Sequence, residues 1–364
     1  MTTPMFTPDG RLLQVEYAGQ ATTHSFPLIA ITLQTENDEN EEDVMIVATL
    51  LSSPRAEREE PNGNIYTEDD KSKNQSKQIT RAQRRIINIP IGPPKITEGN
   101  NSNSGGLIMG VSGVLSDNVA LLKQVQNHME SWYRQYGMHK PHSSTSETTS
   151  NMDTSNGNSA TSAALRIANT IGDACQQNSF GGGIRPFGAS TLICAMESKC
   201  TPSKSSRWVM YTTYPSGSIL KHSPNENRHS DNSSMNIVVV GGETTLQQTL
   251  QNQIETNVQT LSSESNISIS SLAKAIIVTL CDQYEKQMDD KVYLTKKKDV
   301  NCESTNTSLE NINSMLRKLR SNQNIPFMEI AIVSPHSGVQ DLEQSDIHDI
   351  IDLILDSSSS TLEG

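Results

Sequence analysis

Hydrophobic residues are grouped in short runs along this chain, and their spacing predicts the secondary structure of each run. Residues 26–34 (FPLIAITLQ) and 43–51 (DVMIVATLL) are rich in apolar and β-branched residues, as strands are. They flank a short acidic block, so we expect an antiparallel hairpin with a lengthened loop. Similar runs predict further strands over residues 85–90, 106–112, 188–197, 207–213, 218–222, 236–240 and 327–333.

Other segments repeat apolar residues every three or four positions, which predicts amphipathic helices. The clearest covers residues 116–136, with Ser116 as the expected N-cap and Gly137 just after its end. Its predicted apolar face consists of Leu115, Val119, Leu122, Val125, Met129, Trp132 and Tyr136. Further helices are predicted over residues 11–20, 160–177, 243–258, 270–286 and 343–355.

The order of these elements predicts the architecture. Strands are followed by two helices, then by strands, two helices, a strand and a final helix. Such an order is typical of two sheets with helices on their outer faces. We therefore expect an α+β fold, a four-layer α/β/β/α sandwich, with a turn at residues 7–10 and an added N-terminal helix before the first strand.

Polar residues are concentrated in a few blocks that dilute the core. Only 34% of residues are hydrophobic, and counting glycine with them leaves the chain short of the roughly 45–50% typical of globular domains. The blocks bury too little apolar surface to offset chain entropy, so we expect solvated, disordered insertions. We predict one domain over residues 1–356 and a disordered tail over 357–364. The insertions are expected at residues 35–43, 53–80, 96–105, 141–158, 199–205, 224–235 and 296–322.

Charge and cysteine content narrow the class of protein. A net charge of −12 argues against a nucleic-acid partner, because phosphate binding requires clustered cations. The five cysteines are odd in number and form no Cys-x-x-Cys pair, which suits a reducing compartment. No apolar run approaches the roughly 18 residues of a membrane span, and Met1 opens no recognisable signal segment. We therefore expect a protein of the cytoplasm and nucleus without membrane contact.

No motif indicates a metal, a cofactor or an internal nucleophile. His139 and His142 lack further ligands nearby. Ser112 lacks the Gly-x-Ser-x-Gly pattern of a nucleophile elbow. The glycine-rich residues 181–188 precede a predicted strand, whereas phosphate-binding loops precede a helix. We expect neither a cofactor nor a metal site.

The opening stretch, residues 6–18 (FTPDGRLLQVEYA), is the most specific in the chain. It resembles the hallmark of proteasome α-type subunits, Phe-Ser/Thr-Pro-x-Gly-Arg-x-x-Gln-Val-Glu-Tyr-Ala. Later segments are similar to pieces of the same family, in the same order along the chain. These segments are residues 110–117, 183–190, 214–217 and 328–333.

The resemblance implies the N-terminal-nucleophile-hydrolase sandwich and a place in a seven-membered α ring. Such a ring docks on a β ring, restricts substrate entry and binds activator particles in ubiquitin-dependent protein degradation. Aligning residues 84–86 with the family's Glu-Lys-Ile places Arg85 at the lysine that binds the C-terminal carboxylate of an activator tail. The residues implied for ring contacts and the gate region are Phe6, Pro8, Gly10, Arg11, Gln14, Glu16 and Tyr17.

Two alternatives remain open. Catalytic β-type relatives use a threonine freed at the N-terminus, with an aspartate and a lysine downstream. Counting from Thr22 at the β-type spacing reaches Asp38 and then Pro54 rather than a lysine. The resemblance therefore implies a non-catalytic subunit over a catalytic or degenerate relative. The other alternative is a free-standing binding module that recruits partners through its Ser/Thr/Asn-rich blocks.

Overall fold

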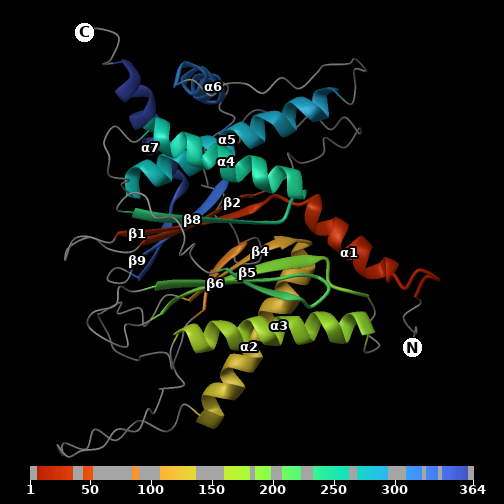
Figure 1. The fold of residues 1–364 in the computed structure, drawn as a ribbon. Helices are drawn as coiled ribbons and strands as arrows, with labels where there is room; N and C mark the ends of the chain where they lie inside the picture. The colour runs from red at the N-terminus through yellow and green to blue at the C-terminus, as the bar shows by residue number, and fades with distance from the viewer. Residues whose placement is uncertain are drawn as a thin grey trace, which may run out of the picture.

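The computed structural model describes residues 6–35, 44–51, 84–89, 107–136, 160–180, 185–197, 207–222, 233–261, 269–293, 309–321, 325–334 and 338–359. Within these residues the chain forms two five-stranded antiparallel sheets and seven helices, so the predicted α+β composition is confirmed. The two sheets face each other, and helices lie on the outer side of each (Figure 1).

The first sheet has the strand order β10-β9-β2-β1-β8. Its centre is the predicted hairpin of β1 (Leu28–Thr35) and β2 (Val44–Leu50), in which Leu28 lies opposite Thr49. Both strands are apolar on both faces because one face meets the second sheet and the other meets helices. The remaining strands are β8 (Ser233–Val240), β9 (Met328–Ser334) and β10 (Gly338–Leu342).

The second sheet has the order β3-β4-β5-β6-β7. The predicted turn at residues 214–217 joins its last two strands. Gly217 donates its N–H to the Tyr214 carbonyl at 2.8 Å and has a φ of +83°, which favours glycine. The strands of this sheet are β3 (Ile86–Asn88), β4 (Leu107–Gly113), β5 (Ala189–Glu197), β6 (Arg207–Thr213) and β7 (Ile219–His222).

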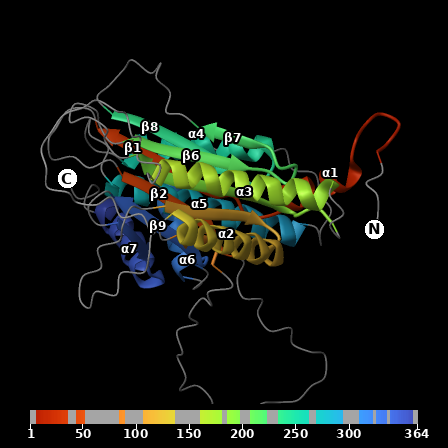
Figure 2. The ribbon, with the colours of Figure 1, turned by 90° about the horizontal axis from the view of Figure 1, so that it is seen from below.

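Buried apolar side chains form three stacked layers. One lies between the first sheet and its helices, one between the two sheets, and one between the second sheet and its helices. The first sheet is covered by α4 (Thr244–Leu261), α5 (Ile269–Tyr293), α6 (Leu309–Ser321) and α7 (Gln344–Ser359). The second is covered by α2 (Leu115–Tyr136) and α3 (Ala160–Phe180), which Figure 2 shows from below.

Helix α6 corrects the prediction that residues 296–322 are wholly a solvated insertion. Its Ile312, Leu316 and Leu319 are buried in the layer between the helices and the first sheet. These residues follow helical spacing, but the Asn, Ser and Glu residues around them mask the pattern in a composition average. The other predicted insertions lie outside the described residues, except that Thr35 ends β1, residues 233–235 begin β8 and residues 357–359 end α7.

The buried face of α2 differs from the predicted one. The helix begins at Leu115, so Ser116 lies within it rather than at its N-cap, and both Leu115 and Val119 are exposed. Its first turn instead buries the polar residues Asp117 and Asn118. The apolar residues that it buries are Leu121, Val125 and Met129. Strand β10 was not predicted, since as an edge strand it carries polar residues at its centre.

Candidate functional site

The N-terminal segment begins with the turn predicted at residues 7–10. Gly10 donates its N–H to the Thr7 carbonyl at 2.8 Å and has a φ of +76°, a region that favours glycine. Thr7 and Arg11 close the turn, since the Thr7 N–H reaches the Arg11 carbonyl at 2.9 Å and the Arg11 N–H reaches Thr7 Oγ1 at 3.0 Å. The turn therefore fixes the direction in which the chain enters the first helix.

Helix α1 (Leu13–Thr23) follows this turn and lies at one end of the molecule, opposite α7, in both views (Figures 1 and 2). It has 11 residues and no side-chain cap at its N-terminus, so it depends on packing for its stability. Its inner face buries the small residues Ala18 and Thr22. Its outer face and the segment before it expose large side chains, namely Phe6, Leu13, Gln14 and Tyr17.

A bidentate ion pair joins the turn to the first turn of α1. Arg11 Nε lies 2.6 Å from Glu16 Oε1, and Arg11 Nη2 lies 2.7 Å from Glu16 Oε2. Both side chains are exposed to water, so the pair stabilises the fold by at most about 1 kcal/mol. Its main effect is to hold two exposed side chains of the predicted contact surface in one orientation.

The inner face of α1 lies against Gly188, just before β5. A Cβ atom at Gly188 would lie 3.1 Å from Ala21 Cβ and 3.2 Å from Val114 Cγ2. A side chain here would therefore require Ala21 or Val114 to shift by a few tenths of an ångström. At the end of the helix, Gly242 donates its N–H to the Thr22 carbonyl at 3.1 Å.

Asp117 and Arg185 hold the Gly188 backbone in place. Arg185 donates from Nη1 to Asp117 Oδ2 at 2.7 Å and from Nη2 to Oδ1 at 2.6 Å, while the Gly188 N–H reaches Oδ2 at 2.8 Å. The Asp117 side chain is 6% exposed and that of Arg185 is 55% exposed. This pair joins two segments that resemble the α-type family, residues 110–117 and 183–190, of which residues 183–184 lie outside the described residues.

The Asp117 carboxylate also affects neighbouring ionisable groups. Its hydrogen bond raises the pKa of Arg185 above the usual value. Burial raises the pKa of the Cys175 thiol to about 11, and the Asp117 charge adds to this effect. The Cys175 thiol therefore stays protonated near neutral pH.

The threonine of the catalytic alternative is not exposed. Thr22 is buried in the last turn of α1, and its Oγ1 donates to the Gly19 carbonyl at 2.7 Å. Nearby, Ser25 Oγ lies 2.6 Å from Ser112 Oγ and 2.8 Å from the Thr22 carbonyl. These contacts fix the chain on the C-terminal side of Thr22. The other positions of that alternative, Asp38 and Pro54, lie outside the described residues.

Arg85 lies at the edge of the second sheet, where it meets β9. Arg85 is 9% exposed, and its backbone N–H donates to Glu329 Oε2 at 2.7 Å. Among the described residues no group accepts a hydrogen bond from Arg85 Nη1. Burial lowers the pKa of Arg85 and raises that of Glu329 to about 7. The exposed cation at this edge is Arg84, whose Nη1 lies 2.8 Å from Asp341 Oδ2.

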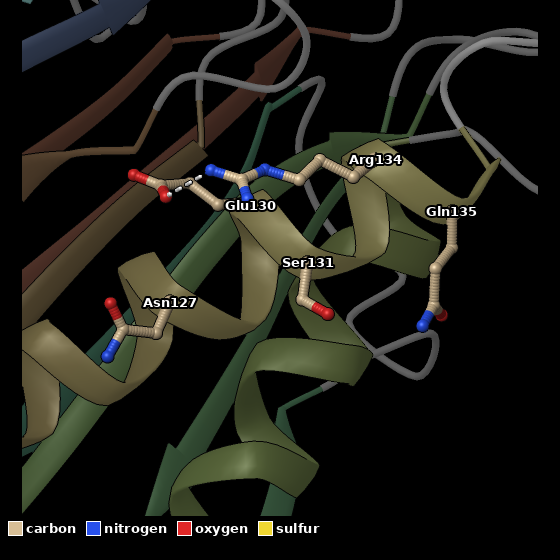
Figure 3. Close-up of a pocket in the computed structure, with 5 residues that line it drawn as sticks. All are labelled: Asn127, Glu130, Ser131, Arg134 and Gln135. Carbon is tan, nitrogen blue, oxygen red and sulfur yellow. Dashed lines mark ion pairs between the residues drawn. The ribbon is translucent and has the colours of Figure 1, made fainter.

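A shallow hollow on the outer face of α2 contains only polar side chains of that one helix (Figure 3). Arg134 Nη2 lies 3.8 Å from Glu130 Oε2 within it. Asn127, Ser131 and Gln135, the other labelled side chains, form no nucleophile–base pair. The hollow therefore offers surface contacts rather than an arrangement for catalysis. Its residues are Asn127, Glu130, Ser131, Arg134 and Gln135.

Metal-binding and membrane-spanning features do not occur among the described residues. In this part of the chain, no three His, Cys, Asp or Glu side chains are grouped as metal ligands. Nor does any helix there combine the length and apolar character that crossing a bilayer requires.

Comparison with known proteins adds one finding. A family model for the N-terminal signature of the proteasome's A-type subunits matches residues 1–21, which include the closed turn, the Arg11–Glu16 pair and most of α1. No match to the chain was found among curated proteins. The N-terminal signature supports a proteasome α-type subunit.

Proposed function

We propose that this protein is a non-catalytic α-type subunit of the proteasome core particle, with a place in its heptameric outer ring. The observation that carries the proposal is the N-terminal signature over residues 1–21. It coincides with a helix that packs on the body through small residues and exposes large ones. Signature and local structure thus favour the same role, contact with other subunits.

The layers of the fold support this proposal. Two antiparallel sheets pack face to face. Helices α4 to α7 cover the outer face of the first sheet, and α2 and α3 cover the outer face of the second. We assign this arrangement to the N-terminal-nucleophile-hydrolase sandwich. Helix α1, at one end of the body, then corresponds to the added helix of α-type subunits (Figure 1).

The exposed residues of the N-terminal segment have separate roles in this proposal. Phe6 and Tyr17 contact neighbouring α subunits, because exposed aromatic side chains are the usual anchors of such interfaces, and the exposed Gln14 adds a polar contact. Arg11 and Glu16 orient this surface through their ion pair, and Pro8 and Gly10 shape the turn at the channel entrance.

The protein would restrict the entry of unfolded substrates into a proteolytic chamber formed by the β ring. It would do so in the cytoplasm and nucleus, within ubiquitin-dependent protein degradation. Activator docking requires Arg85 to become accessible, because it is 9% exposed and a terminal carboxylate would reach it from solvent. An Arg85→Ala variant with unchanged activator affinity would remove this part and leave the ring role intact.

The deciding experiment is to measure the native mass of the tagged protein from its own cells, with peptidase activity followed across the fractions. Co-migration with a particle of many hundreds of kilodaltons that has threonine-type peptidase activity supports the proposal. A single species near 40 kDa contradicts it and favours the free-standing binding module. N-terminal sequencing of the mature chain adds a second test, since a start at Thr22 would indicate a catalytic relative.

A further inference from the structure

We propose that Asp117, held by Arg185, is the positioning residue that sets where α1 lies on the body. We call Val114, Asp117, Arg185 and Gly188 the α1 seat. The placement of α1 by this seat does not depend on the proposed function. Only its consequence for ring assembly does.

Helix α1 has few means of holding its own position. It is short and uncapped, and only its small inner residues are buried. A helix of this length is marginal in water without tertiary contacts. Its position therefore depends on the surface beneath it.

The middle of that surface is Gly188, whose two backbone groups are both engaged. Its carbonyl accepts the Val114 N–H at 2.9 Å, and its N–H donates to Asp117 Oδ2 at 2.8 Å. The missing side chain lets Ala21 approach closely. The Gly188 backbone thus cannot move without breaking a hydrogen bond on one side or the other.

Asp117 makes this arrangement an electrostatic one. A carboxylate that is 6% exposed is costly unless its charge is compensated, and Arg185 compensates it through two hydrogen bonds. Loss of Arg185 leaves a buried charge uncompensated, and Asp117→Asn keeps one acceptor oxygen but places a donor NH2 group against the Arg185 guanidinium. Residues 185–188 would then shift so that these groups can reach water or another partner. Because α1 packs on Gly188, it would shift as well.

A shift of α1 on the seat would also move the side chains on its exposed face. Leu13 and Tyr17 are exposed on the same short helix whose Ala18 lies on the seat, so a shift of the seat displaces them by a similar distance. Subunit interfaces pack as closely as protein interiors and tolerate such displacement poorly. The seat therefore controls a contact surface in which neither Asp117 nor Arg185 takes part.

The test compares Asp117→Asn and Arg185→Met in the full chain by hydrogen exchange. We expect at least tenfold faster exchange of the α1 amides in each variant, with α4 and α5 unchanged. Arg185→Met keeps the test usable if Asp117→Asn fails to fold, because the Arg185 side chain is half-exposed. The matched control is Asp282→Asn, which removes a carboxylate that accepts from Gln253 and pairs with Lys286 on the far layer.

Unchanged α1 exchange in a folded Arg185→Met variant would overturn the inference, whatever the protein assembles with. Faster exchange of the α1 amides in Asp282→Asn would also overturn the inference, because the faster exchange would then reflect a general loss of stability. Assembly into the large particle is measured separately. If the unaltered protein forms no particle, the proposed function fails while the exchange result still decides the role of the seat.

Discussion

Replacing Tyr17 by alanine tests whether the outer face of α1 is an interface between subunits. The tyrosine is 61% exposed, so in the isolated chain its loss should change the free energy of unfolding by no more than about 0.5 kcal/mol. A tyrosine presents about 200 Å² of surface, of which about 120 Å² is available to a partner. At about 25 cal/mol per Å² this area is worth about 3 kcal/mol. Alanine retains part of this contact area, so the substitution should cost about 2 kcal/mol of binding free energy, or about a 30-fold loss of affinity.

The assay is competition for incorporation into the particle. Differently tagged Tyr17→Ala and unaltered chains are expressed together, and their ratio is measured in the particle and in the free pool. We expect the variant to be depleted in the particle by about 30-fold, and Tyr17→Phe, which keeps the ring, by less than about threefold. Leu353→Ala is the control, because Leu353 is 53% exposed on α7 at the opposite end. Equal incorporation of Tyr17→Ala and the unaltered chain would refute the reasoning.

Three further predictions concern the isolated chain. Leu316→Ala should lower the free energy of unfolding in urea by about 3 kcal/mol, since Leu316 is buried on α6, and a negligible change would mean that α6 is not part of the core. Gly113→Ala should lower it by about 3 kcal/mol or more, because the new Cβ would lie 2.2 Å from the Gly188 carbonyl at a φ of +127°, and an unchanged melting temperature would contradict the close approach. Glu329 has a pKa raised from 4.5 to about 7, so the folded state holds a proton that the unfolded state has lost, and stability should fall with rising pH by on the order of 3 kcal/mol across this interval. Urea titrations at pH 5 and pH 8 should show this fall reduced in Glu329→Gln, and an identical pH dependence would show that Glu329 is not its source.

Local patterns in the sequence were sufficient to predict most of the elements. The hairpin of β1 and β2 follows from two apolar runs around an acidic block, and the turn at residues 7–10 follows from proline and glycine chemistry. Helix α6 was missed although Ile312, Leu316 and Leu319 have helical spacing, because a composition average over a polar block hides three buried residues. A search for helical period inside the block would have found it.

The roles of the predicted site residues remain predictions. The exposed aromatic residues of the N-terminal segment were named from the resemblance alone, and their exposure agrees with a contact role that remains a proposal. Arg85 was named on the same ground, but its side chain is buried in the structure. Burial of a long side chain depends on which strand lies across it, here β9, and nothing in residues 84–86 indicates that neighbour.

The sequence by itself determined local features of this protein: where most of its strands and helices form, where its turns require glycine, and which stretch resembles the α-type family. These depend on interactions between residues a few positions apart. Only the tertiary structure decided which face of α2 is buried and that Asp117 meets Arg185, 68 positions away along the chain. The approach of Gly188 to α1 is likewise set by how the two sheets and α1 pack. Contacts between distant segments depend on the geometry of whole layers, which no local pattern of residues contains.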